Sequence, residues 1–137
     1  MAVVRSDVNY IRIGARSNVQ DGSVLHVTRS YPGSDAGWPL LIGEDVVIAH
    51  KVTVHGCSIG NRVLVGIGAI VLDGVVVEDE VMIGAGSVVT PGKRLTSGGL
   101  YLGNPARRVR DLTDAERARI PVMAGFYVDL KNEFQTP

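Results

Sequence analysis

The stretch Ile59–Leu95 reads IGNRVL VGIGAI VLDGVV VEDEVM IGAGSV VTPGKR L when it is divided into blocks of six residues. An aliphatic residue opens every block, at positions 59, 65, 71, 77, 83, 89 and 95. The same step continues upstream, from Ile42 through Ile48 to Val54 and from Ile13 through Val19 to Leu25. An α-helix has a period of 3.6 residues and an isolated strand a period of 2, so neither explains a period of six.

A period of six residues is typical of a parallel β-helix with a triangular section. Each flat face takes six residues, each coil takes 18, and the strands of one coil stack on those of the next. The chain has 17 glycines and few aromatic residues (Phe 2, Trp 1, Tyr 4), which suits a narrow core filled by valine and isoleucine. The sequence therefore predicts an all-β fold in which the aliphatic column points inward and the following residue points outward.

The rhythm is broken in three places. Leu25 and Ile42 are 17 residues apart, and the turn-rich segment 30–40 (SYPGSDAGWPL) between them is expected to loop out of the coil. Val54 and Ile59 are five residues apart, which is a one-residue deletion just after His55. Beyond Leu95 the pattern fades. We expect residues 1–97 to form the β-helix and residues 98–137 to form an exit segment and a C-terminal helix.

The C-terminal helix has its own signals. Thr113-Asp114-Ala115-Glu116 has the spacing of a capping box, so a helix over about 114–134 should follow. We expect Pro121 to interrupt or kink this helix. An apolar stripe is expected to dock on the coil or on a neighbouring subunit: Ile120, Val122, Met123, Phe126, Tyr127 and Leu130.

Composition excludes several classes of protein. Lysine plus arginine equals aspartate plus glutamate, 14 each, so no positive field favours nucleic acid or a membrane surface. No apolar run approaches the ~20 residues of a membrane span, and the N-terminus has no signal-peptide pattern. The single cysteine, Cys57, forms no internal disulfide and is typical of a small buried side chain. These features predict a soluble, cytoplasmic protein.

All three histidines, His26, His50 and His55, lie in one 30-residue window. His26 and His55 are 29 residues apart, which is one 18-residue coil plus the 11 residues of segment 30–40. With that loop excised, both should stack in register and point outward from one face. His50 falls at a corner one face earlier. Chance placement in turns and strand edges is one explanation; the other is a three-imidazole metal site completed across the interfaces of a trimer.

Three segments resemble γ-class carbonic anhydrases: Arg5–Gly14, Asn18–Val27 and Ala49–Cys57. The resemblance extends over essentially the whole chain, including Gly103–Ala106. It implies left-handed coils and a homotrimer in which His26 and His55 of one subunit and His50 of its neighbour hold zinc. Iron and cobalt are also compatible with three imidazoles. The implied activity is the reversible hydration of carbon dioxide to bicarbonate, for which zinc lowers the pKa of a bound water to ~7.

The resemblance also assigns roles to other residues. Gln20 would orient the nucleophile, Asn18 would line the pocket, and Tyr127 would reach the site. The alternatives are that the two amides bond to turns and that the tyrosine only packs. The resemblance further implies that Arg5 and Asp21 pair across the interface and that Asp7 is another interface carboxylate, roles that would fix the register between subunits.

Departures from the family pattern bear on activity. The family has one or two further coils before Arg5, so we expect either that the start is truncated or that the first coil is incomplete, and Ser6 replaces a glycine. The loop over 30–40 offers only Asp35 as an acidic group. Proton removal limits turnover, so hydration is expected to be slow or absent. Two other functions stay open: a hexapeptide-repeat acyltransferase that uses a histidine as general base, and a non-catalytic metal-binding trimeric scaffold.

Overall fold

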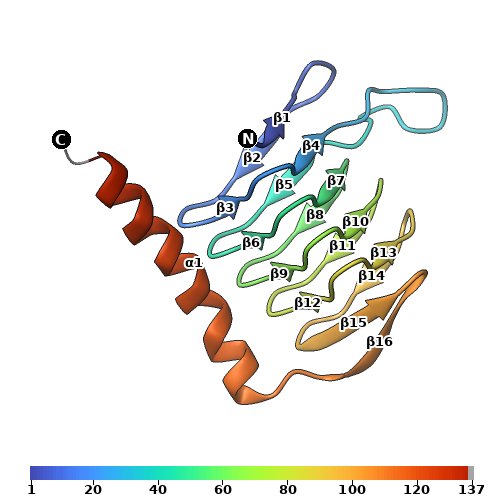
Figure 1. The fold of residues 1–137 in the computed structure, drawn as a ribbon. Coiled ribbons are helices and arrows are strands. Elements are labelled where there is room, and N and C mark those ends of the chain that lie inside the picture. The colour runs from blue at the N-terminus through green and yellow to red at the C-terminus, as the bar shows by residue number, and fades with distance from the viewer. Residues whose placement is uncertain (136–137) are drawn as a thin grey trace.

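The computed structural model describes residues 1–135 as a stack of coils with three flat walls and one helix alongside (Figure 1). Sheet A holds β1 (Val3–Val4), β4 (Val24–His26), β7 (Thr53–His55), β10 (Ile70–Val71) and β13 (Val88–Val89). Sheet B holds β2 (Ile11–Ile13), β5 (Leu40–Ile42), β8 (Ser58–Ile59), β11 (Val76–Val77) and β14 (Arg94–Leu95). Sheet C holds β3 (Asn18–Val19), β6 (Val47–Ile48), β9 (Leu64–Val65), β12 (Met82–Ile83), β15 (Gly99–Gly103) and β16 (Ala106–Asp111).

The predicted parallel β-helix of hexapeptide repeats is confirmed. Neighbouring strands of each sheet pair in parallel one coil apart, and β16 alone folds back antiparallel onto β15. The aliphatic column lies in register, with Leu25 on Val54 and Val54 on Val71. All three side chains are fully buried. The core is therefore a narrow shaft of β-branched and leucine side chains, as the period of six residues predicts.

The first coil departs from this pattern. Ile13 was expected to point into the core, but it is 41% exposed, and Val19 is only partly buried. Both residues lie in the first strands of their sheets, so they have a neighbouring coil on one side only. A six-residue period identifies which side of a strand faces the core, whereas burial also requires coils above and below.

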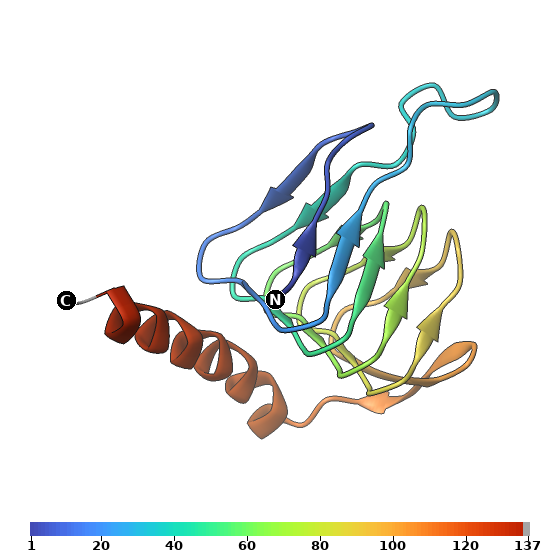
Figure 2. The ribbon, with the colours of Figure 1, turned by 45° about the horizontal axis from the view of Figure 1, so that its top comes forward.

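The loop between β4 and β5 projects from the stack (Figure 2). Thr28 and Trp38 form an antiparallel bridge at its base. The Nδ2 atom of Asn9 donates hydrogen bonds to the carbonyls of Thr28 and Ala36, at 3.0 and 2.9 Å. The loop ends one residue earlier than the expected range 30–40, because Leu40 begins β5 and is fully buried.

Helix α1 (Asp114–Gln135) runs outside the stack, next to sheet C (Figure 1). The capping box is confirmed: the Thr113 amide donates to Glu116 Oε2 at 2.9 Å, and the Glu116 amide donates to Thr113 Oγ1 at 3.2 Å. The expected interruption at Pro121 is wrong, since the helix runs unbroken through it. Burial of Ile120 and Ala124 explains this continuity, because tertiary packing holds the turn that contains the proline.

Only one edge of the apolar stripe packs on the chain itself. Ile120 joins a cluster with Leu100 and Leu112, whereas Val122 and Phe126 are exposed. The whole stripe therefore does not dock on its own coil, and docking of its exposed part on a neighbouring subunit stays a prediction. Among the described residues, no helix combines the length and the apolar composition needed to cross a lipid bilayer.

The capping box predicts a pH dependence of stability. Arg110 and the Thr113 amide lower the pKa of Glu116 from 4.5 to about 2. A lowered carboxyl pKa in the folded state stabilises the protein above the ordinary value, and this stabilisation is lost as pH falls from about 4.5 towards 2. We expect Glu116→Gln to flatten the decline of the free energy of unfolding over this range, measured by urea denaturation. Glu133→Gln, a control at the other end of α1, should leave the decline unchanged.

Candidate metal centre

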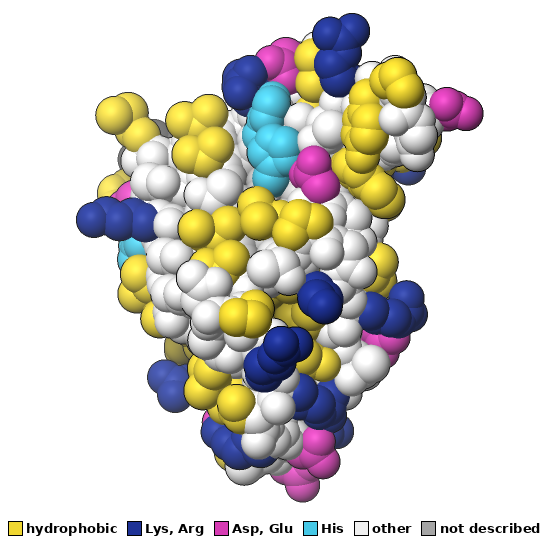
Figure 3. Space-filling model, turned by 90° about the vertical axis from the view of Figure 1, so that its right-hand side faces the viewer, with side chains coloured by type: hydrophobic (Ala, Val, Ile, Leu, Met, Phe, Trp, Pro, Cys, Tyr) yellow, Lys and Arg dark blue, Asp and Glu magenta, His cyan; other side chains and the backbone are white. Residues whose placement is uncertain are grey.

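Two histidines meet on the outer face of sheet A. His26 ends β4 and His55 ends β7, and the two residues are direct partners in the parallel register, as their spacing predicts. Each follows a buried aliphatic residue, so each imidazole points outward. The ring centroids are 4.9 Å apart, and Nδ1 of His26 lies 2.9 Å from Nε2 of His55. Figure 3 shows this side of the molecule, with histidine forming a continuous patch beside acidic side chains.

A carboxylate holds the outer nitrogen of each ring. Asp7 Oδ1 lies 2.8 Å from Nε2 of His26, and Asp73 Oδ1 lies 2.6 Å from Nδ1 of His55. The hydrogen bond with His26 and the nearby Arg5 guanidinium hold the pKa of the Asp7 carboxyl below its usual 3.8. Asp73 is itself held by Thr28, whose hydroxyl donates to Oδ2 at 2.6 Å. Carboxylates that orient imidazoles in this way are typical of metal sites in proteins.

Sequence reasoning missed Asp73 and Thr28. The 18-residue coil length contained a signal for the first of them, because Asp73 follows His55 by 18 residues. A polar residue one coil away in an outward position is a candidate partner for any site residue. Thr28 has no such signal, since it reaches Asp73 only through the path of the projecting loop.

The arrangement suits a cation between the two rings. Three short contacts involve the four ring nitrogens, but two neutral imidazoles carry only two protons between them. If those protons point to Asp7 and Asp73, the facing nitrogens both present lone pairs. Tetrahedral zinc with bonds of about 2.0–2.1 Å would separate its ligand nitrogens by about 3.4 Å. The observed 2.9 Å would have to open by roughly half an ångström, which small rotations of the rings supply.

His50 lies away from this pair. It follows β6 at the corner between sheets C and A and is exposed, whereas His55 lies at the far end of β7. Within residues 1–135, no group of three or more His, Cys, Asp or Glu side chains is arranged to hold a metal ion. A single chain therefore presents two imidazoles in one place and the third in another.

The other predicted site residues lie along β3 and on α1 rather than beside the pair. Gln20 follows β3 at the same corner and is 8% exposed, and its Nε2 donates to Asn18 Oδ1 at 3.2 Å. The Nδ2 atom of Asn18 is buried and has no hydrogen-bond partner in the part of the chain that the structure describes. Asn18 and Tyr127 both line a depression of about 400 Å³. The chain thus carries two half-sites, one on sheet A and one at the C–A corner.

The charged residues assigned to the interface also lie in these two regions of the chain. Arg5 forms an ion pair with Asp7 within the chain. Asp21 lies at the C–A corner, 3.5 Å from the amino group of Met1. Contact between Arg5 and Asp21 across a subunit interface stays a prediction.

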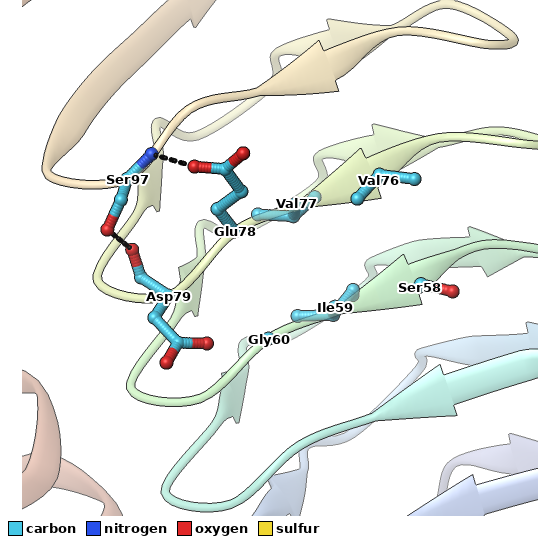
Figure 4. Close-up of a pocket in the computed structure, with 8 residues that line it drawn as sticks. All are labelled: Ser58, Ile59, Gly60, Val76, Val77, Glu78, Asp79 and Ser97. Atoms are coloured by element: carbon cyan, nitrogen blue, oxygen red, sulfur yellow. Dashed lines mark hydrogen bonds between the residues drawn. The ribbon is translucent and has the colours of Figure 1, made fainter.

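The remaining features lack the chemistry of a site. A shallow depression of about 500 Å³ on sheet B, shown in Figure 4, has Glu78, Asp79 and Ser97 on its lining but no histidine. Ser97 uses its amide to bond Glu78 and its hydroxyl to bond the Asp79 carbonyl.

Cys57 is buried, and this burial raises the pKa of its thiol, so it is not a nucleophile at neutral pH.

Comparison with known sequences gives relatives of several kinds. Residues 56–91 match the family described as bacterial transferase hexapeptide (six repeats). The chain is 57% identical over 134 residues to Protein YrdA of Escherichia coli, covering 98% of this chain and 73% of that protein. It is 42% identical over 128 residues to Gamma carbonic anhydrase 1, mitochondrial, of Arabidopsis thaliana. That match covers 93% of this chain, which spans less than half (46%) of the length of the Arabidopsis protein.

Solved structures show the same fold. A hexapeptide transferase family protein from Anaplasma phagocytophilum superposes with a TM-score of 0.87 at 36% identity, covering 97% of this chain and 74% of that one. A putative acetyltransferase from Bacillus cereus superposes with a TM-score of 0.89 at 35% identity, covering 97% and 73%. The names of these relatives include a carbonic anhydrase and a putative acetyltransferase, so the site residues must decide between these two activities.

Proposed function

The chain belongs to the γ-class carbonic anhydrase-like family of left-handed hexapeptide-repeat β-helix proteins, and from this premise we propose that it is a metal-dependent enzyme that hydrates carbon dioxide to bicarbonate reversibly. It acts as a homotrimer with one site at each subunit interface. His26 and His55 of one subunit and His50 of the next provide the ligands.

One observation carries this proposal: two imidazoles with carboxylates on their outer nitrogens turn their inner nitrogens toward each other at 2.9 Å. Neutral imidazole suits zinc, and also iron and cobalt. The two half-sites of one chain lie at opposite ends of β7, so neither is complete alone. A neighbour in a closed ring of three would bring its C–A corner against sheet A of this chain and complete the set.

Different residues of the chain then have different roles in the reaction. Asp7 and Asp73 hold the two imidazoles in orientation through the outer ring nitrogens. Gln20, buried and held by Asn18, positions an amide beside the ligand His50, and Asn18 lines the pocket. When bound, zinc with three neutral imidazoles lowers the pKa of water to about 7 and so supplies the nucleophile. The projecting loop has Asp35 as its one acidic side chain, so proton export is slow and depends on external buffer.

The test is metal analysis of the purified trimer together with stopped-flow hydration of carbon dioxide. We expect one metal per subunit, hydration that is lost on chelation and restored by the metal, and acceleration by an imidazole buffer. His55→Ala should lose both metal and activity. A wild-type trimer without stoichiometric metal would refute the proposal, and so would a metal-loaded trimer that hydrates no faster than buffer.

A second candidate is acetyl transfer. The observation that favours it is the short contact between His55 and Asp73, since a carboxylate-held imidazole is also the arrangement of a general base. This function needs one histidine per site and no metal. Acetyl-coenzyme A turnover by metal-free protein, retained in His50→Ala, would favour it over carbon dioxide hydration.

A further inference from the structure

We propose that Asp73, held by the hydroxyl of Thr28, is a positioning residue that fixes the tautomer and the ring orientation of His55, so that Nε2 is the nitrogen presented to the metal. This inference rests on the proposed metal site. It concerns a carboxylate that none of the sequence motifs identified.

Both oxygens of the Asp73 carboxylate are committed. Oδ1 lies 2.6 Å from Nδ1 of His55, and Oδ2 accepts the Thr28 hydroxyl at 2.6 Å. An ionised carboxylate only accepts hydrogen bonds, so the proton of the neutral ring must lie on Nδ1. Thr28 Oγ1 is 3.4 Å from Nδ1, and its own proton already points to Asp73. Nε2 is then left as a lone pair facing His26.

The fold leaves room for this carboxylate. Gly56 follows His55 with a positive φ of 51°, and a Cβ atom there would lie 2.5 Å from Asp73 Oδ1. The same Cβ would lie 2.7 Å from the Cβ of Trp38, at the base of the loop. Glycine at position 56 therefore allows the loop to close over the corner while Asp73 reaches His55.

The loop and the imidazole are connected through this contact. Thr28 pairs with Trp38 in the antiparallel bridge that forms the base of the loop. The Trp38 indole lies over Gly74, the residue after Asp73, where a Cβ would be 3.2 Å from the ring. Asp73 is thus fixed on one side by the loop and on the other by the coil that carries β10. Because this carboxylate is already fixed, His55 needs little reorganisation when a metal ion binds.

The first test uses metal-free protein, so it does not depend on activity. The chain has three histidines, and their ring ¹⁵N signals can be assigned by single substitutions. At about pH 8.5, where free imidazole is neutral, we expect His55 to be protonated on Nδ1 in the wild type. Asp73→Asn presents an amide that can donate to Nδ1, and the signals should shift towards the other tautomer.

The second test is the metal dissociation constant, measured by competition with a chelator. Asp73→Asn should weaken binding about 10- to 100-fold, the usual effect of losing a carboxylate behind a metal-bound histidine. Thr28→Val keeps the carboxylate but removes its support, so we expect a smaller loss in the same direction. Asp35→Asn, an exposed acid in the same loop, is the matched control and should change neither the tautomer nor the affinity. Circular dichroism and the trimer mass check that each variant is folded.

The outcomes separate this inference from the proposed function. If the wild type binds metal but Asp73→Asn keeps the His55 tautomer and the affinity, the role of Asp73 is refuted and the metal site stands. If Asp73→Asn changes the tautomer in a protein that binds no metal, the proposed function is refuted and the orienting role of Asp73 stands.

Discussion

His50→Ala is expected to remove the metal from the trimer without unfolding it. The His50 side chain is exposed at the C–A corner, so its removal should cost its own chain little packing. As a ligand to the neighbouring subunit's site, however, it supplies one of three metal bonds. We expect the metal affinity to fall more than about 100-fold, because losing a ligand costs more than losing a carboxylate that only orients a ligand. Metal analysis after dialysis and competition with a chelator measure it.

The control for this variant is Lys93→Ala, another exposed side chain, which directly precedes β14 at the end of sheet B. It should retain the full metal content. If His50→Ala binds metal as tightly as the wild type, the shared site is wrong, and the His26–His55 pair either binds alone or has no metal role.

Gly66→Ala is expected to destabilise the stack strongly. A Cβ at this position would lie 2.6 Å from the amide nitrogen of Ala85 and 2.7 Å from the carbonyl oxygen of Ile83. Both are backbone atoms of the next coil, and the Gly66 amide already donates to that carbonyl at 2.8 Å. Neither can move without breaking the ladder of sheet C. We expect the free energy of unfolding to fall by about 3 kcal/mol.

Urea denaturation at fixed protein concentration measures this loss, since an oligomer's stability depends on concentration. Gly125→Ala is the matched control, because nothing lies within 4 Å of its added Cβ and it is inside α1. That substitution should raise stability by about 0.5–1 kcal/mol. Equal stability of Gly66→Ala and the wild type would contradict the close approach of the coils.

The repeat predicts the fold well because it is a local rule applied many times. Each aliphatic position is specified by its own coil, so the register of Leu25, Val54 and Val71 follows from counting. The stacking of His26 on His55 follows from the same counting once the loop is removed. Ile13 deviates because its burial depends on the number of coils around it, which the period does not contain.

The surroundings of the site are harder to predict, because they depend on side-chain reach. Asp73 contacts His55 only because Gly56 leaves room and because Thr28 turns its hydroxyl inward. Neither condition can be read from the spacing of residues in the sequence. The helix shows the same limit: Pro121 predicts a break, but burial of Ile120 and Ala124 keeps α1 continuous. Patterns thus locate residues on faces, and packing decides which of them meet.

Mixed trimers of His50→Ala and His55→Ala subunits test the shared site most directly. Neither homotrimer should hold metal, since each lacks one ligand at every interface. In a mixed ring, one interface joins the intact His26–His55 pair of a His50→Ala subunit to the intact His50 of a His55→Ala subunit. Trimers separated by two different affinity tags should therefore regain one metal ion each, together with hydration activity. Mixed trimers that stay free of metal, while the wild type is loaded, would contradict a site built from two subunits.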